Sequence, residues 1–208
     1  VLLHGVPSSS SMFRNLMPLL ARNFHVLAPD LIGFGNSAAP SRESFEYTFE
    51  NLTGFLAALK VDQYFLYVFD YGAPIGFRLA MRHPERVLGI VSQNGNIYQE
   101  GLGPKWAERA KYWANPTPEL RAQYESAFAP ETIKGQYLTG EKPGTVGPDG
   151  YSLDITHTTE PGYAERQDDL IFDYQTNVAL YPQFQDYVRQ YQPEILAAWG
   201  KNDPSFIY

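Results

Sequence analysis

Short apolar runs alternate with longer helical patterns along the chain, and this alternation constrains the fold more than any other feature. Runs of about five residues, bounded by turn-forming residues, suit strands buried on both faces. Candidate strands are Val1–Leu3, Phe24–Ala28, Tyr64–Phe69, Leu88–Ser92 and Ile195–Trp199. Between them, apolar residues recur at helical spacing in Met12–Arg22, Phe45–Leu59 and Ala73–Met81. Strand and helix repeats of this kind predict an α/β fold with a doubly wound, mostly parallel sheet.

The strand signals stop between residues 98 and 192. Helical patterns replace them, in Trp106–Trp113, Thr117–Phe128 and Ala164–Tyr174, and the Gly- and Pro-rich stretch Gly140–Gly150 is typical of a loop. The sequence therefore predicts three parts. Residues 1–97 form an α/β core, residues 98–192 form an inserted helical cap, and residues 193–208 resume the core.

Composition excludes several classes of protein. Hydrophobic residues make up 44% of the chain, as in globular proteins, and no apolar run approaches the roughly 18 residues of a membrane span. The net charge of −7, without a basic cluster, argues against nucleic acid and anionic membranes as partners. The chain has no cysteine, which leaves no disulfide, thiol chemistry or Cys-ligated metal.

The strongest local signal runs from Val68 to Gly76. An apolar strand enters a tight turn that opens directly into a helix, which is the pattern of a nucleophile elbow. Asp70 occupies the position of the nucleophile, and Gly72 leaves room for the close crossing of the chain. The following helix N-terminus favours an ionised, nucleophilic carboxylate. Helix capping by Asp70 would explain the aspartate, but not the strand, the turn and the glycines together.

Three more segments complete a recognisable pattern. His4–Pro7 follows a strand, residues 28–37 (APDLIGFGNS) follow the next one, and Trp199–Pro204 follows the last. In this order, they resemble the α/β-hydrolase superfamily, and specifically its aspartate-nucleophile branch of epoxide hydrolases and haloalkane dehalogenases. The likeness covers the whole chain and implies an α/β-hydrolase fold with a cap inserted over the sheet.

The resemblance implies a two-step hydrolysis without a metal or an organic cofactor. Asp70 attacks an electrophilic carbon and forms an alkyl-enzyme ester, which a water activated by histidine then hydrolyses. The backbone N–H groups of Val6 and Tyr71 would form the oxyanion hole, and Asp203 would orient the histidine. Glu100 is an alternative to Asp203, because some dehalogenases place the acid after the preceding strand.

The family's histidine follows the acid, and none of the four histidines of this chain does. The sequence ends five residues after Asp203 and opens inside an apolar run without Met. We therefore expect a fragment that lacks both ends of the fold and is catalytically inactive by itself. The expected location is the cytoplasm, although a targeting segment would precede Val1.

The leaving group is predicted from the cap. Epoxide hydrolases protonate the ring oxygen with cap tyrosines, for which Tyr137 and Tyr174 are candidates. Dehalogenases hold the halide with N–H donors, for which Trp106 and Trp113 are candidates. The balance favours epoxide hydrolysis to a diol, with dehalogenation as the alternative and another hydrolase or a ligand-binding receptor as a further one. The expected partner is a small apolar organic substrate, and the oligomeric state is open.

Overall fold

A computed structural model describes residues 1–208. Four parallel strands form one sheet in the order β1–β2–β3–β4, which is also their order along the chain. The strands are β1 (Leu2–Leu3), β2 (Tyr64–Phe69), β3 (Val87–Gln93) and β4 (Ile195–Ala198). The parallel α/β architecture is thus confirmed, and four of the five expected strands are present.

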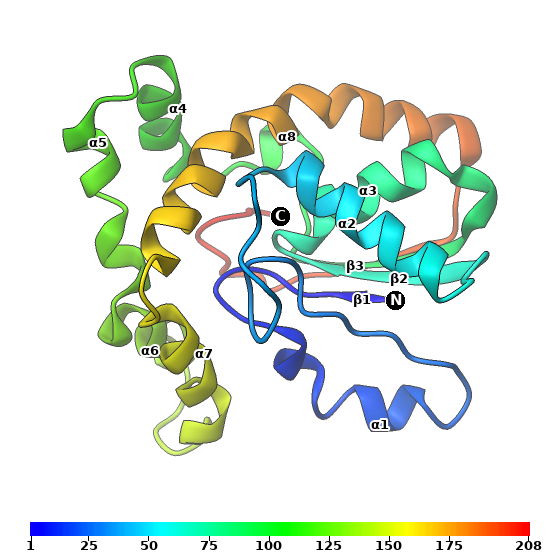
Figure 1. Cartoon of the computed structure of the whole chain (residues 1–208), viewed down its shortest axis with the longest axis horizontal. Helices are drawn as coiled ribbons and strands as arrows, with labels where there is room; N and C mark the ends of the chain where they lie inside the picture. Colours follow the sequence, from blue (N-terminus) through cyan, green and yellow to red (C-terminus); the bar gives the residue numbers. More distant parts are fainter.

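Three helices cover one face of the sheet: α2 (Phe45–Ala58), α3 (Gly72–Arg82) and α8 (Tyr163–Tyr191) (Figure 1). The Ser44 hydroxyl caps α2 by accepting the Tyr47 N–H, 3.1 Å away. Helix α3 ends at Arg82, and Pro84, two residues later, starts a 3-10 turn instead of continuing the helix. The main core lies between these helices and β2 and β3.

A second group of helices lies beside the sheet, facing the carboxyl ends of the strands (Figure 1). It consists of α4 (Trp106–Ala114), α5 (Pro118–Ala122), α6 (Pro130–Leu138), α7 (Ser152–Thr158) and the first half of α8. Thr117 caps α5 through the Leu120 N–H, as its sequence predicts. Helices α6 and α7 have no counterpart among the predicted elements. The 3-10 turns of the chain are Ser10–Phe13, Pro84–Arg86, Gln99–Gly101, Glu125–Phe128 and Pro148–Gly150.

Helix α8 joins the two groups. It continues 17 residues beyond the predicted end at Tyr174, and curves from the helices beside the sheet onto the sheet's covered face (Figure 1). Pro182 lies inside it, where the missing N–H and the ring weaken the local hydrogen bonding that keeps a helix straight. The second half packs against α3, with Phe184 on Phe77 at a ring distance of 5.9 Å.

Three predicted elements are wrong. Thr117–Phe128 is not one helix, because α5 ends at Ala122 and the chain then forms the 3-10 turn Glu125–Phe128. Phe24–Ala28 forms no strand, because its neighbour β1 has only two residues and the pairing is limited to one bond, from Leu2 N–H to the Leu27 carbonyl. Met12–Arg22 is not one helix, because Pro18 lacks the N–H that a continuous helix needs. The chain instead forms a 3-10 turn and then α1 (Met17–Leu20), with Pro18 in its first turn.

The opposite face of the sheet remains partly open. Phe65 on β2 is 51% exposed and Leu196 on β4 is 63% exposed, and all four residues of β4 are exposed. Phe24 contributes one edge-on contact to Phe65, at a ring distance of 6.0 Å. None of the helices combines the length and the apolarity that crossing a bilayer requires.

Candidate active site

Asp70 lies in the turn between β2 and α3, with a φ angle of +47°. A residue with a side chain rarely adopts this left-handed conformation, so the turn is strained and holds the carboxylate in one direction. Gly72 makes the crossing possible, because a Cβ there would overlap the Leu3 carbonyl oxygen on β1. Gly76 likewise lies directly against Val68, where a Cβ would overlap the valine side chain. The predicted elbow geometry is present.

Burial raises the pKa of Asp70 to about 6. The backbone N–H groups of Val6 and Tyr71 and the positive charge of Arg109 act in the opposite direction, whereas the charge of Asp203 raises the pKa further. At pH 7 the carboxylate is therefore still mostly ionised, as a nucleophile must be.

The turn after β1 supplies the main hydrogen bond to this carboxylate. The Val6 N–H donates to Asp70 Oδ1 at 2.9 Å. This carboxylate oxygen is therefore already stabilised by a backbone N–H group. His4, just before Val6, is fully buried and its Nε2 accepts the Leu31 N–H at 2.9 Å. Burial lowers the His4 pKa to about 4, which keeps the ring neutral. His4 therefore fixes the turn instead of taking part in proton transfer.

Asp203 follows β4 and is held on both carboxylate oxygens. Oδ1 accepts the N–H groups of Ser205 (2.7 Å) and Phe206 (3.1 Å), and Oδ2 accepts the side-chain amide of Asn94 (2.5 Å). Glu100 is exposed on a 3-10 turn and makes no hydrogen bond or ion pair. Of the two candidate acids, Asp203 is thus the one that the fold anchors and whose charge acts on Asp70.

None of the four histidines forms a hydrogen bond or an ion pair with Asp70 or Asp203. His25 is exposed in an irregular segment, and His83 ends α3, with Nδ1 4.0 Å from Glu85. His157 is buried on α7. Burial raises the pKa of the nearby Asp154, and a charge on His157 would lower it. The described residues also contain no group of three or more His, Asp or Glu side chains arranged to hold a metal ion.

The two candidate tyrosines lie in different places. Tyr174 is fully buried on α8, with its ring 5.7 Å from that of Tyr71, and its hydroxyl is 3.4 Å from that of Tyr181. Burial raises the pKa of Tyr174 well above its usual value and that of Tyr181 to about 12, and the negative charge of Asp70 adds to both shifts. Tyr137 instead bonds through its hydroxyl to Asp154 on α7.

Tyr181 is not among the site residues predicted from the sequence. It stands seven positions after Tyr174, which places both on the same face of a helix. The signal was therefore present, but it required α8 to continue past Tyr174.

Both candidate tryptophans donate their indole N–H to backbone carbonyls. Trp106 donates to Ser205 at 2.8 Å, and Trp113 donates to Ile171 at 2.9 Å. The Trp106 ring lies 4.5 Å from the ring of Tyr174 and therefore belongs to the site wall. In this arrangement neither indole has a free N–H to offer a ligand.

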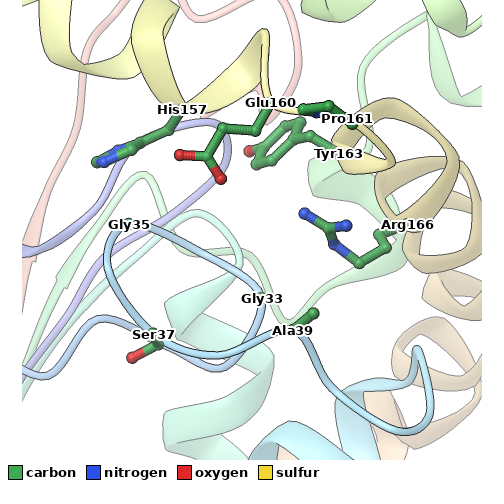
Figure 2. A pocket seen from close by; sticks show the side chains of 9 residues that line it. All are labelled: Gly33, Gly35, Ser37, Ala39, His157, Glu160, Pro161, Tyr163 and Arg166. Carbon is green, nitrogen blue, oxygen red and sulfur yellow. The ribbon is translucent and has the colours of Figure 1, made fainter.

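A cavity of about 240 Å³ lies between the 33–39 turn and the connection from α7 to α8 (Figure 2). Its wall includes Tyr163, whose hydroxyl donates to the Pro7 carbonyl at 3.3 Å, and Figure 2 shows the Glu160 and Arg166 side chains extending into it. Asp30 holds the neighbouring turn by accepting the N–H groups of Ser10 and Asn36. Through Tyr163, the wall of the cavity is joined to Pro7 in the turn after β1.

Known proteins share this architecture. The model of the α/β hydrolase fold family matches residues 1–133. An uncharacterized hydrolase of Saccharomyces cerevisiae is 42% identical over 215 aligned residues, which cover 99% of this chain and 73% of the relative. Haloalkane dehalogenase 1 of Mycobacterium tuberculosis is 42% identical over 100 residues, which cover 46% of this chain and one third (33%) of that enzyme.

Solved structures agree in fold. A proposed epoxide hydrolase from Pseudomonas aeruginosa superimposes with a TM-score of 0.76 at 19% identity, covering 95% of this chain and 70% of that one. A loop variant of the haloalkane dehalogenase DbeA from Bradyrhizobium elkanii gives a TM-score of 0.74 at 20% identity, covering 99% and 73%. With the family match and the yeast relative, these likenesses show that the chain belongs to the α/β hydrolase fold family.

Proposed function

We propose that Asp70 is the nucleophile of a hydrolase that opens epoxides through an alkyl-enzyme ester. The observation that carries the proposal is the strained elbow, which aims a carboxylate whose Oδ1 already accepts the Val6 N–H. A capping aspartate would need neither the left-handed backbone nor this long-range bond. The relatives named as haloalkane dehalogenases and the proposed epoxide hydrolase of similar fold support the same chemical class.

In the first step, Asp70 Oδ2 attacks a ring carbon of the epoxide. A carbon–oxygen bond forms to the carboxylate, the ring carbon–oxygen bond breaks, and the alkoxide takes a proton from the hydroxyl of Tyr174 or Tyr181. The alkylation removes the negative charge of Asp70, which contributes to the raised pKa of both hydroxyls. Each tyrosine therefore becomes a stronger acid while the leaving oxygen needs its proton.

In the second step, water attacks the ester carbonyl, and the former Oδ1 becomes the oxyanion. The N–H groups of Val6 and Tyr71 stabilise it. The ester bond breaks, the leaving alkoxide takes the remaining proton of the attacking water, and the diol leaves with the Asp70 carboxylate restored. The base that deprotonated the water returns that proton to the tyrosinate left by the first step. Asp203 would orient the base that deprotonates the water. Since no histidine contacts Asp203, we propose that these 208 residues form the ester and that its hydrolysis requires a base supplied from outside them.

Dehalogenation is the second candidate, favoured by the names of the relatives. The same nucleophile would displace a halide, which needs N–H donors and no proton. Trp106 and Trp113 do not supply these donors, because their indole N–H groups already bond to carbonyl oxygens. The tyrosine pair beside Asp70 instead fits an epoxide oxygen.

Intact-mass measurement after incubation with an epoxide tests the proposal. The expected adduct adds the whole mass of the epoxide, maps to Asp70 and accumulates, and Asp70→Asn forms none. An adduct with alkyl halides alone, together with free halide, would favour dehalogenation. Tight ligand binding without any adduct would overturn the nucleophile assignment and favour a receptor.

A further inference from the structure

Two polar side chains near the nucleophile, those of Arg109 and Tyr71, lack a hydrogen-bonding or ionic partner within the protein. Arg109 on α4 is partly exposed and makes no hydrogen bond or ion pair, and the Tyr71 hydroxyl makes no hydrogen bond. The Arg109 guanidinium and the Tyr71 hydroxyl are not fully buried, in contrast to the polar atoms that lack a partner in the protein interior. Both therefore remain accessible to a molecule in the site, although Tyr71 is only 4% exposed.

A series of tilted ring contacts links Arg109 to the active site. The guanidinium lies over the ring of Trp106, 4.2 Å from its centre. That ring is 4.5 Å from Tyr174, and Tyr174 is 5.7 Å from Tyr71, the residue after the nucleophile. Consistent with this position, the charge of Arg109 opposes the burial effect on the pKa of both Asp70 and Tyr71.

Two acidic side chains of α4 and α8 lie beside other cations, although Asp168 Oδ1 is buried without a hydrogen-bond partner. Asp168, whose charge acts on Tyr71, lies 3.8 Å from Arg121, and Glu108 pairs with Lys111 at 2.7 Å. The guanidinium has five N–H donors in a planar fork that matches a carboxylate. Without an anionic side chain as a partner, the Arg109 guanidinium keeps these donors free for solvent or a ligand.

We propose that Arg109 and Tyr71 bind a carboxylate on the substrate, so that the preferred substrates are epoxides that carry a carboxylate on a short apolar body. This inference rests on the proposed function, since it assigns the other end of the same substrate. The tyrosine pair Tyr174 and Tyr181 takes the epoxide oxygen, which leaves the guanidinium and the Tyr71 hydroxyl for a second polar group. One guanidinium and one hydroxyl match the two oxygens of a carboxylate.

Calorimetric binding of two unreactive probes of equal size tests the carboxylate site. We expect phenylacetate to bind roughly 10- to 100-fold more tightly than phenylacetamide, as a charge-assisted bond to arginine implies. Arg109→Met should bring the two affinities within about threefold of each other, and Tyr71→Phe should reduce the preference in part.

Arg166→Met is the matched control. Arg166 also lies in the cap, makes no hydrogen bond or ion pair, and stacks on a ring, that of Tyr163 at 5.9 Å, but it extends into the separate cavity of Figure 2. This variant should keep the full preference for phenylacetate. If Arg109→Met does not fold, Tyr71→Phe still tests the site.

Three results would overturn the carboxylate site: equal affinity of the two probes for the unmodified chain, a preference that survives in Arg109→Met, or an equal loss in Arg166→Met. These outcomes are independent of the chemistry at Asp70, because neither probe reacts. Absence of an epoxide adduct would instead refute the proposed function and leave the binding result standing.

Discussion

The side-chain amide of Asn94 donates to Asp203 Oδ2 at 2.5 Å and joins the ends of β3 and β4. The same amide accepts the Gly200 N–H at 3.1 Å, and Asn94 itself has a φ angle of +47°. One residue therefore fixes both the acid and the strand end that carries it. Asparagine suits the position because it tolerates the left-handed conformation better than most residues with side chains.

Asn94→Ala should destabilise the chain by about 1–3 kcal/mol, because it removes both bonds and places alanine in a left-handed conformation. Asn94→Gly loses the same bonds without the backbone strain, so its effect should be smaller. Urea denaturation of the parent chain and of both variants measures the free energy of unfolding, and so separates the lost hydrogen bonds from the backbone strain. An unchanged midpoint for Asn94→Ala would mean that this contact carries no stability.

Gly72→Ala should destabilise the fold by about 2–4 kcal/mol, since the new methyl group would overlap the Leu3 carbonyl and force the elbow away from β1. Gly54→Ala is the natural comparison, because a Cβ there meets nothing within 4 Å on helix α2. That substitution should stabilise the chain by about 0.5–1 kcal/mol. Thermal unfolding of the pair should therefore shift in opposite directions, and a shift in the same direction would contradict the elbow geometry.

The rate of ester formation should depend on the ionisation of Asp70. With its pKa raised to about 6, the rate should reach half of its maximum near pH 6 and fall about tenfold for each unit below it. The time course of adduct formation by mass spectrometry measures this profile. A half-maximum near pH 4 would show that Asp70 titrates like an exposed carboxyl.

The raised pKa of Asp70 also affects the stability of the folded chain, which should fall as pH rises, whereas the rate of ester formation should increase. The folded chain holds the Asp70 proton more tightly than the unfolded chain, so this contribution is complete below about pH 4 and is lost as pH rises to 6. Asp70→Asn does not titrate, so its stability relative to the parent chain should grow over this interval and then level off. A constant difference between pH 4 and 7 would exclude the linkage.

Replacing both Tyr174 and Tyr181 by phenylalanine should slow alkylation by epoxides roughly 10²- to 10⁴-fold, the usual contribution of a general acid. Alkylation by an alkyl halide needs no proton and should change far less, which separates acid catalysis from a packing defect. Tyr137→Phe serves as the control, because its hydroxyl bonds to Asp154 and not to the pair. An equal loss with both reagents would refute the acid role.

The elbow and the anchored acid could be predicted from the sequence because each is a local pattern. The strand before Asp70, the glycine after it and the helix that follows are contiguous, and so are β4 and Asp203. The strand at Phe24–Ala28 could not be judged in this way, because pairing depends on a neighbour of sufficient length and β1 has two residues.

The helices beside the sheet were harder to predict, because their side chains find partners far away in the sequence. The Trp106 indole bonds to Ser205, 99 positions later, so its occupied N–H had no local signal. Tyr181 was not found because the predicted helix ends at Tyr174, whereas α8 continues to Tyr191. Arg109 stood out only once the ion pairs of its neighbours were known.

The open side of the sheet has a consequence for how these 208 residues behave in solution. Phe65 and Leu196 present apolar surface there, and β4 leaves a row of backbone donors and acceptors along a free edge. Surfaces of this kind pair with copies of themselves, so the chain should self-associate as its concentration rises. Sedimentation velocity over a dilution series would reveal it, and Leu196→Lys should shift the distribution towards monomer.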